Sequence, residues 1–90
     1  MRTHPETGRK GLFINRNFTS HILGLERAES DALLAFLQQH IEQPEFMVRL
    51  HWEKDTIAMW DNRCTQHYAA VDYTSQRTVN RVTICGDRPY

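Results

Sequence analysis

A histidine and two arginines near the end of the sequence could take part in chemistry. His67 follows a polar turn and lies between Trp60 and Tyr68 in the sequence, and a neutral imidazole is a common metal ligand. Arg77 and Arg81 are four positions apart, so both would face the same side of a β-strand. A guanidinium binds a carboxylate through paired, charge-assisted hydrogen bonds. The pattern therefore indicates an anion pocket, suited to a dicarboxylate, beside a histidine.

These same residues have simpler interpretations. A single histidine is more often a surface residue or a hydrogen-bonded core residue than a metal ligand. Two arginines on a strand more often belong to a solvated face or to a network of ion pairs. Spacing alone leaves both interpretations open. Trp60 and Tyr68 are expected to pack in the core, with a role in lining a pocket as the alternative. The Asp61–Asn62–Arg63 segment is expected to build the turn that presents His67, through side-chain bonds to the backbone.

The elements that would position these residues are one helix followed by antiparallel strands. Residues 28–42 carry apolar side chains at helical spacing, acidic residues near the start, and Pro44 after the end. This helix is expected to pack on a core through Leu33, Leu34, Phe36, Leu37, His40 and Ile41. Before it, residues 4–11 are expected to form a loop. Strands are predicted at 12–15, 46–52, 56–60, 65–69 and 77–85.

So few strands and one helix do not close a barrel, and several strand edges would be exposed. The predicted fold class is thus mainly β with one packed helix, and the chain is expected to be part of a larger domain. Exposed strand edges also favour self-association of the isolated piece.

Composition excludes several classes of protein. The 90 residues contain 40% hydrophobic and 24% charged residues, as in one small globular domain. Eleven basic and eleven acidic residues balance, which argues against nucleic-acid and membrane-surface partners. No long apolar run or leader segment is visible, so a cytoplasmic location is expected. Cys64 and Cys85 are predicted to be reduced thiols, with one disulfide between them as the alternative.

The order of motifs along almost the whole chain resembles the taurine dioxygenase (TauD/TfdA) family of Fe(II)/2-oxoglutarate-dependent dioxygenases. The strongest resemblance is the late signature Trp60-Asp61-Asn62-Arg63-x-Thr65-x-His67-Tyr68-Ala69, Asp72-Tyr73 and Arg77-x-x-x-Arg81-Val82-Thr83-Ile84-x-Gly86-Asp87-x-Pro89. Upstream, the family's pattern is matched by His4-Pro5-Glu6-Thr7-Gly8-Arg9-Lys10, Leu12-Phe13-Ile14-Asn15, Phe18-Thr19, Gly24-Leu25, Glu29-Ser30, Leu33-Leu34, Pro44-Glu45-Phe46 and Arg49.

The resemblance implies a fold and a set of roles. Residues 1–90 would form the C-terminal portion of a double-stranded β-helix, a jelly roll with helices packed outside. His67 matches the family's late iron-binding histidine. Arg77 matches the arginine that holds the distal carboxylate of 2-oxoglutarate. Arg81 matches a second arginine, which would meet the cosubstrate or an anionic group of the substrate.

The implied activity is oxidative decarboxylation of 2-oxoglutarate with O2, giving succinate and CO2 and hydroxylating a small anionic substrate. A sulfonate, a sulfate ester and a carboxylate are all compatible with Arg81. Hydroxylation next to the heteroatom of a sulfonate or sulfate ester gives an unstable product that releases sulfite or sulfate.

One departure from the family pattern limits this expectation. The family binds Fe(II) with an early His-x-Asp pair as well as the late histidine, and the 90 residues contain no His-x-Asp. His4-Pro5-Glu6 matches the family's loop rather than its ligand pair, and His51 with Glu53 is interpreted as a solvated pair. The isolated chain is therefore expected to be inactive. The alternatives are a non-catalytic half-domain that binds a partner, and a small anion-binding protein without metal.

Overall fold

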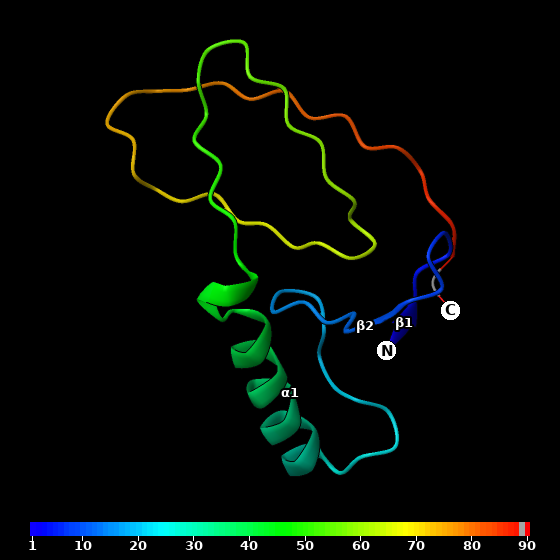
Figure 1. Ribbon diagram of the computed structural model, residues 1–90. Helices are drawn as coiled ribbons and strands as arrows, with labels where there is room; N and C mark the ends of the chain where they lie inside the picture. The colour runs from blue at the N-terminus through cyan, green and yellow to red at the C-terminus, as the bar shows by residue number, and fades with distance from the viewer. Residues whose placement is uncertain (89) are drawn as a thin grey trace. The chain divides into compact units, whose positions relative to one another are not determined.

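The computed structural model describes residues 1–88 and residue 90, which form two compact units (Figure 1). Unit 1 consists of Met1–Phe13 and Trp60–Tyr90, and unit 2 consists of Ile14–Met59. Unit 1 contains His67, Arg77 and Arg81, whereas unit 2 contains the helix. Each unit is described by itself.

Unit 1 begins with a short hairpin. Strands β1 (Arg2–Thr3) and β2 (Lys10–Gly11) are antiparallel, with Arg2 opposite Gly11 and Thr3 opposite Lys10. The loop between them closes through a 2.8 Å hydrogen bond from the Gly8 amide to the His4 carbonyl. Gly8 has a φ of 69°, a backbone conformation that glycine adopts without strain. The loop predicted at 4–11 is therefore confirmed, except that its last two residues form β2.

Unit 2 is built around helix α1 (Arg27–Ile41), which confirms the helix predicted at 28–42 to within one residue at each end. The Glu29 carboxylate accepts a 3.1 Å hydrogen bond from the Glu26 amide, which satisfies a backbone donor next to the helix start. Arg27 pairs with Asp31 one turn later, at 3.0 Å. A short 3₁₀ turn, Pro44–Phe46, follows the helix, and proline suits the first position of such a turn.

The loop before α1 contacts the helix at Ser30 and the residue that follows the helix, Glu42. The Ser30 hydroxyl accepts a 2.8 Å hydrogen bond from the Ile22 amide, and Ser30 is only 1% exposed. Arg16 forms an ion pair with Glu42, in which Arg16 Nη2 lies 2.9 Å from each of the two carboxylate oxygens. The first contact is part-buried and the second is exposed, so we expect Ser30 to contribute more to stability.

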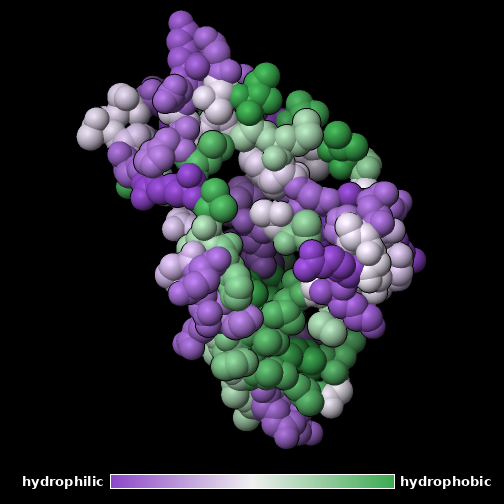
Figure 2. Space-filling model, viewed as in Figure 1, coloured by the Kyte–Doolittle hydropathy of each residue, from purple (hydrophilic) through white to green (hydrophobic). Residues whose placement is uncertain are grey.

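The apolar face of α1 is covered much less than its spacing predicts. Leu34 is the one buried apolar side chain among the described residues, at 5% exposure. Leu37 and Ile41 are partly exposed, whereas Leu33 is 41% and Phe36 64% exposed. Figure 2 is drawn in the same view as Figure 1, and apolar side chains (green) are visible on its surface where α1 lies. The expectation that this helix packs on a core is thus correct for Leu34 and wrong for the exposed Leu33, Phe36 and His40.

The predicted strands are not formed. Residues 12–15, 46–52, 56–60, 65–69 and 77–85 belong to no strand in the structure, and the two strands that form lie at β1 and β2. A strand exists only when another strand accepts and donates its backbone hydrogen bonds. Alternation of apolar and polar residues predicts which side would be buried, but it does not supply the neighbour.

Two smaller predictions concern the cysteines and membrane spans. Cys64 and Cys85 are free thiols at exposed positions, which confirms that they do not form a disulfide. Among the described residues, no helix has the length and apolar content needed to cross a bilayer.

Candidate functional site

A tight turn precedes His67 in unit 1. The Asp61 carbonyl accepts hydrogen bonds from the amides of Cys64, at 3.2 Å, and Thr65, at 3.0 Å. The Asp61 carboxylate also accepts a 2.8 Å bond from the Arg63 amide, which is the side-chain turn typical of aspartate. The expectation that Asp61, Asn62 and Arg63 build this turn through bonds to the backbone is confirmed for Asp61.

His67 lies against the residue that precedes this turn. The rings of Trp60 and His67 are 4.5 Å apart between centroids, at an angle of 51°. The Trp60 indole N–H donates a 2.9 Å hydrogen bond to the Asn62 side chain, which ties the ring to the turn. His67 is exposed, as is Tyr68 at 80%. The prediction that Tyr68 packs in the core is therefore wrong, and Trp60 packs against His67 rather than in a core.

The two arginines are placed on exposed chain beyond His67. The Arg77 guanidinium lies over the Tyr73 ring, 4.2 Å from its centroid. This cation–π contact stabilises an exposed guanidinium only modestly. Arg81 is exposed as well. Among the contacts of the described residues, no hydrogen bond, ion pair or ring contact joins His67 to Arg77 or to Arg81.

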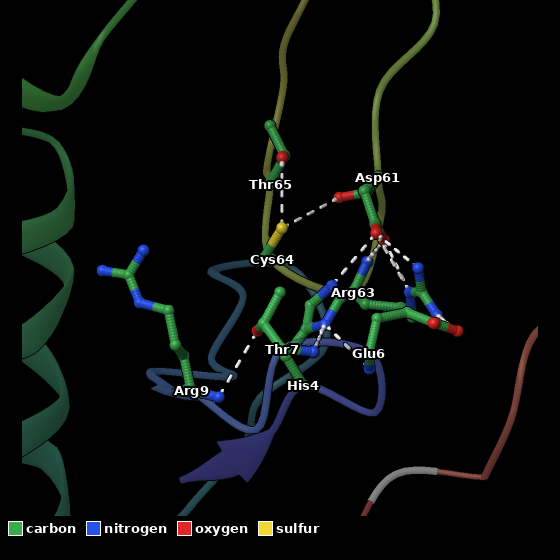
Figure 3. A network of polar contacts seen from close by, with 8 residues as sticks. All are labelled: His4, Glu6, Thr7, Arg9, Asp61, Arg63, Cys64 and Thr65. Atoms are coloured by element: carbon green, nitrogen blue, oxygen red, sulfur yellow. Dashed lines mark hydrogen bonds and ion pairs between the residues drawn. The ribbon is translucent and has the colours of Figure 1, made fainter.

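A network of polar side chains connects the turn to the β1–β2 hairpin (Figure 3). We call it the polar cluster; it consists of His4, Glu6, Asp61 and Arg63. His4 Nε2 lies 3.1 Å from Asp61 Oδ2. Arg63 donates from Nη2 to Asp61 Oδ2 at 2.7 Å and from Nε to Asp61 Oδ1 at 2.9 Å. Arg63 Nη1 also lies 3.6 Å from Glu6 Oε1. The cluster thus links residues that are 57 positions apart.

These contacts change the proton affinity of the groups involved. Hydrogen bonds from the Arg63 side chain, and then from its amide, hold the pKa of the Asp61 carboxyl far below its usual range, with a smaller effect of His4. The Asp61 carboxylate in turn raises the pKa of Arg63. Asp61 and Arg63 therefore each favour the charged form of the other.

Two members of the polar cluster, together with Cys64, form the one group of described residues that could hold a metal ion. The ligand atoms of His4, Asp61 and Cys64 lie within 4.8 Å of one another. However, the Arg63 guanidinium contacts both oxygens of Asp61, and a cation bound there would be repelled by it. His4 uses one ring nitrogen for Asp61 and the other for two backbone amides. The arrangement fits a hydrogen-bond network better than a metal centre.

His67 belongs to no such group within the part of the chain that the structure describes. His51 and Glu53 are both exposed, as expected for solvated side chains. An iron centre of the expected kind needs two histidines and a carboxylate on one face. These residues supply one imidazole of that set, so they do not fit a complete iron site.

The polar cluster was missed by reasoning from the sequence. Its members were assigned to two separate features, a His-Pro loop and an Asp-Asn-Arg turn, and nothing in their spacing indicates a contact across 57 positions. The available signal was chemical. A histidine and a glutamate in one loop, and an aspartate and an arginine in another, are complementary in charge and in hydrogen bonding.

Comparison with known proteins gives the class to which these features belong. The family model of the "Taurine catabolism dioxygenase TauD, TfdA family" matches residues 1–83. The chain therefore belongs to the TauD/TfdA family, and the resemblance of its motifs to that family is confirmed. No solved structure matches the chain.

Individual relatives agree with this assignment. The chain is 44% identical to an alpha-ketoglutarate-dependent sulfate ester dioxygenase of Pseudomonas putida, over 99% of this chain and 30% of the relative. It is 44% identical to a putative alpha-ketoglutarate-dependent sulfonate dioxygenase of Schizosaccharomyces pombe, over 100% of this chain and 24% of the relative. It is also 44% identical to an alpha-ketoglutarate-dependent 2,4-dichlorophenoxyacetate dioxygenase of a Burkholderia species, over 98% of this chain and 30% of the relative. The chain thus spans less than a third of the length of each of these three relatives.

Proposed function

We propose that this chain carries the late part of the active site of an Fe(II)/2-oxoglutarate-dependent dioxygenase. His67 would be one iron ligand, and Arg77 would bind the distal carboxylate of 2-oxoglutarate. Arg81 would bind the cosubstrate or an anionic group of the substrate. The observation that carries this proposal is the family match over residues 1–83, which includes all three side chains.

The local chemistry of each residue supports its proposed role. His67 is held from one side by the Trp60 ring, at 4.5 Å, and is exposed, so its ring is accessible to an ion. Arg77 presents its guanidinium beside an aromatic ring, an arrangement that leaves the planar edge free to bind a carboxylate through two parallel hydrogen bonds. When bound, Fe(II) would supply the oxidative chemistry, and this chain's residues would position the ion and the keto acid.

The remaining iron ligands and the partners of the predicted strands would come from a larger jelly-roll domain. The alternating segments at 65–69 and 77–85 would become strands of that domain once their backbone groups find neighbours. Without those ligands, one imidazole does not hold Fe(II) against water. The 90-residue chain alone is therefore expected to release no succinate above background when Fe(II), 2-oxoglutarate and substrate are supplied, and robust turnover would contradict this account.

The proposed substrate is a small organic anion, with O2 as the oxidant. The relatives named above act, by their names, on a sulfate ester, a sulfonate and 2,4-dichlorophenoxyacetate. All three substrates combine an organic group with one anionic group, which Arg81 could meet. Sulfonates, sulfate esters and carboxylates are the substrate classes to test.

A segment exchange tests the proposal directly. The matching portion of the Pseudomonas putida sulfate ester dioxygenase would be replaced by this chain, and substrate-dependent succinate release would be measured. The hybrid is expected to turn over. His67→Ala is expected to lower turnover by at least about 100-fold. Removing a residue that only hydrogen-bonds to a metal ligand costs about 10- to 100-fold in activity, and removing the ligand itself should cost more. His51→Ala is the matched control and is expected to have no effect, since His51 is exposed.

The role of Arg77 is tested in the same hybrid. Arg77→Met is expected to raise the KM for 2-oxoglutarate by about 10- to 100-fold, because charge-assisted hydrogen bonds contribute about 1.5–3 kcal/mol. Arg27→Met, on the surface of α1, is the matched control and is expected to leave this KM unchanged. The proposal is wrong if a folded hybrid does not turn over, or if it turns over equally well with His67→Ala.

A second candidate is a non-catalytic half-domain that binds a partner or an anion. The specific observation in its favour is that His67 belongs to no group of metal-ligating side chains among the described residues. Calorimetry on the chain without iron separates the two functions. Tight binding of 2-oxoglutarate to the metal-free chain would favour the anion-binding module, whereas the dioxygenase proposal predicts weak binding until the rest of the pocket is present.

A further inference from the structure

The contacts of His4 indicate which of its ring nitrogens carries a proton. The amides of Glu6 and Thr7 both point at His4 Nδ1, each at 3.3 Å, so Nδ1 acts as the acceptor. The ring proton must then lie on Nε2, which donates to Asp61 Oδ2 at 3.1 Å. His4 is only 14% exposed at its side chain. The imidazole thus connects the backbone of the hairpin loop to the carboxylate that begins the turn.

Asp61 is held from the turn as well as from the hairpin. Arg63 approaches both carboxylate oxygens from within the turn, and His4 approaches Oδ2 from the hairpin. Arg63 Nη1 also lies 3.6 Å from Oε1 of Glu6, which belongs to the hairpin loop. The cluster is therefore a chain of three side-chain contacts, His4–Asp61, Asp61–Arg63 and Arg63–Glu6, that joins two segments of unit 1. Each segment contributes one acidic and one proton-donating side chain.

The segment held in this way leads directly to His67. The Asp61 carbonyl holds the amides of Cys64 and Thr65, and Trp60, next to Asp61, lies against the His67 ring. A change in the position of Asp61 would therefore move both the ring that packs on His67 and the chain that carries it. Side chains around a metal ligand that fix its ring orientation strongly affect metal affinity.

We propose that His4 and Arg63 are positioning residues for His67, acting through Asp61 and the turn. This inference rests on the proposed function for its biological meaning, since a fixed ring matters because His67 would bind iron. The physical claim concerns the metal-free chain: the hydrogen bond from His4 to Asp61 sets the packing of Trp60 against His67.

Two substitutions of His4 separate its two hydrogen bonds. In His4→Gln, the longer side chain places an amide N–H near the former Nε2 and can still donate to Asp61. In His4→Asn, the shorter side chain places an oxygen near the former Nδ1, so it keeps the bonds from the Glu6 and Thr7 amides and loses the bond to Asp61. The readout is the NMR shift of the His67 ring protons, which the nearby Trp60 ring displaces.

The expected result is a split between the two variants. His67 ring shifts in His4→Gln should match those of the unsubstituted chain, and those in His4→Asn should move toward the values of an unstructured histidine. Arg63→Gln should move them in the same direction. Arg16→Ala, which removes an ion pair in unit 2, is the control and should leave them unchanged. The amide signals of β1 and β2 report whether the hairpin is intact in each variant.

The inference is overturned by either of two results. One is an unchanged His67 ring in both His4→Asn and Arg63→Gln. The other is a nitrogen spectrum that places the His4 proton on Nδ1 in the unsubstituted chain. Should His4→Asn also lose the hairpin, Arg63→Gln decides the outcome, because Arg63 lies outside the hairpin. Neither result depends on iron, so a failure here leaves the segment exchange as a separate test of the proposed function.

Discussion

Helix α1 and residues 65–85 differ in where the partners for their backbone hydrogen bonds would come from. The 15 residues of α1 satisfy most of their backbone hydrogen bonds within the helix, and Glu29 provides a partner for an amide at its start. Residues 65–85 form no helix or strand in the structure, although they contain all three proposed site residues. A helix needs only its own sequence for its hydrogen bonds, whereas a strand needs a neighbour. The three proposed site residues therefore lie in the part of the chain whose predicted strands need neighbours that these 90 residues do not provide in the structure.

The largest expected effect is at the one buried apolar side chain of the helix. Leu34→Ala should destabilise unit 2 by about 2–5 kcal/mol, because it removes buried methyl groups and leaves a cavity. Phe36→Ala is the matched control in the same helix, and since Phe36 is 64% exposed it should change stability by less than about 0.5 kcal/mol. Thermal melts followed by circular dichroism at the helix band would measure both. Equal losses would show that burial in unit 2 differs from the structure.

A smaller effect is expected at the part-buried contact between the loop and α1. Ser30→Ala would leave the Ile22 amide without its 2.8 Å partner. An unsatisfied buried donor costs about 1–3 kcal/mol, and the same melts would report it. Ser20→Ala, at an exposed position in the same loop, should be nearly neutral. A neutral Ser30→Ala would mean that the loop is not attached to the helix there.

The pH dependence of the polar cluster follows from the lowered pKa of Asp61. Because the folded chain holds this proton less tightly than the unfolded chain does, the cluster contributes its full stability above the ordinary carboxyl pKa of about 3.9. That contribution is lost as the pH falls below this value toward the lowered pKa. Carbon NMR of the Asp61 carboxyl should show it still ionised when ordinary carboxyls are protonated. Arg63→Gln should return its titration toward the ordinary range, and an unshifted Asp61 in the unsubstituted chain would contradict the structure.

The smallest effect is expected at the exposed ion pair of unit 2. Arg16→Ala should cost no more than about 1 kcal/mol, because both side chains are about half exposed and solvent screens the pair. The cost should decrease further as salt is added. A loss comparable to that of Ser30→Ala, or one that does not respond to salt, would show that Arg16 has a second role.

The features that the sequence predicts well are those determined over a few residues. The helix at 28–42 and the Asp61 turn both form because their hydrogen bonds join close neighbours in the chain. The contact of His4 with Asp61 spans 57 positions and has no signature in spacing. The strands at 46–52 and 77–85 were predicted from alternation, which describes burial and does not provide the hydrogen-bonded partner that a strand needs.

The family was identified from the order of whole motifs, and the family match over residues 1–83 confirms it. The roles of His67, Arg77 and Arg81 stay predictions, and so does the jelly roll. No physical argument from the spacing of these three residues could replace the contacts that a complete pocket would show. The segment exchange described above supplies that missing context.

Amide hydrogen exchange tests the central claim most directly, by comparing this chain alone with the same chain placed in the hybrid enzyme. The account predicts that amides of α1 are protected in both, and that amides of 65–69 and 77–85 exchange freely in the isolated chain and become protected in the hybrid. Protection of these two segments in the isolated chain would contradict the claim that their strand partners lie elsewhere. Free exchange of the same segments in an active hybrid would contradict the claim that they become strands.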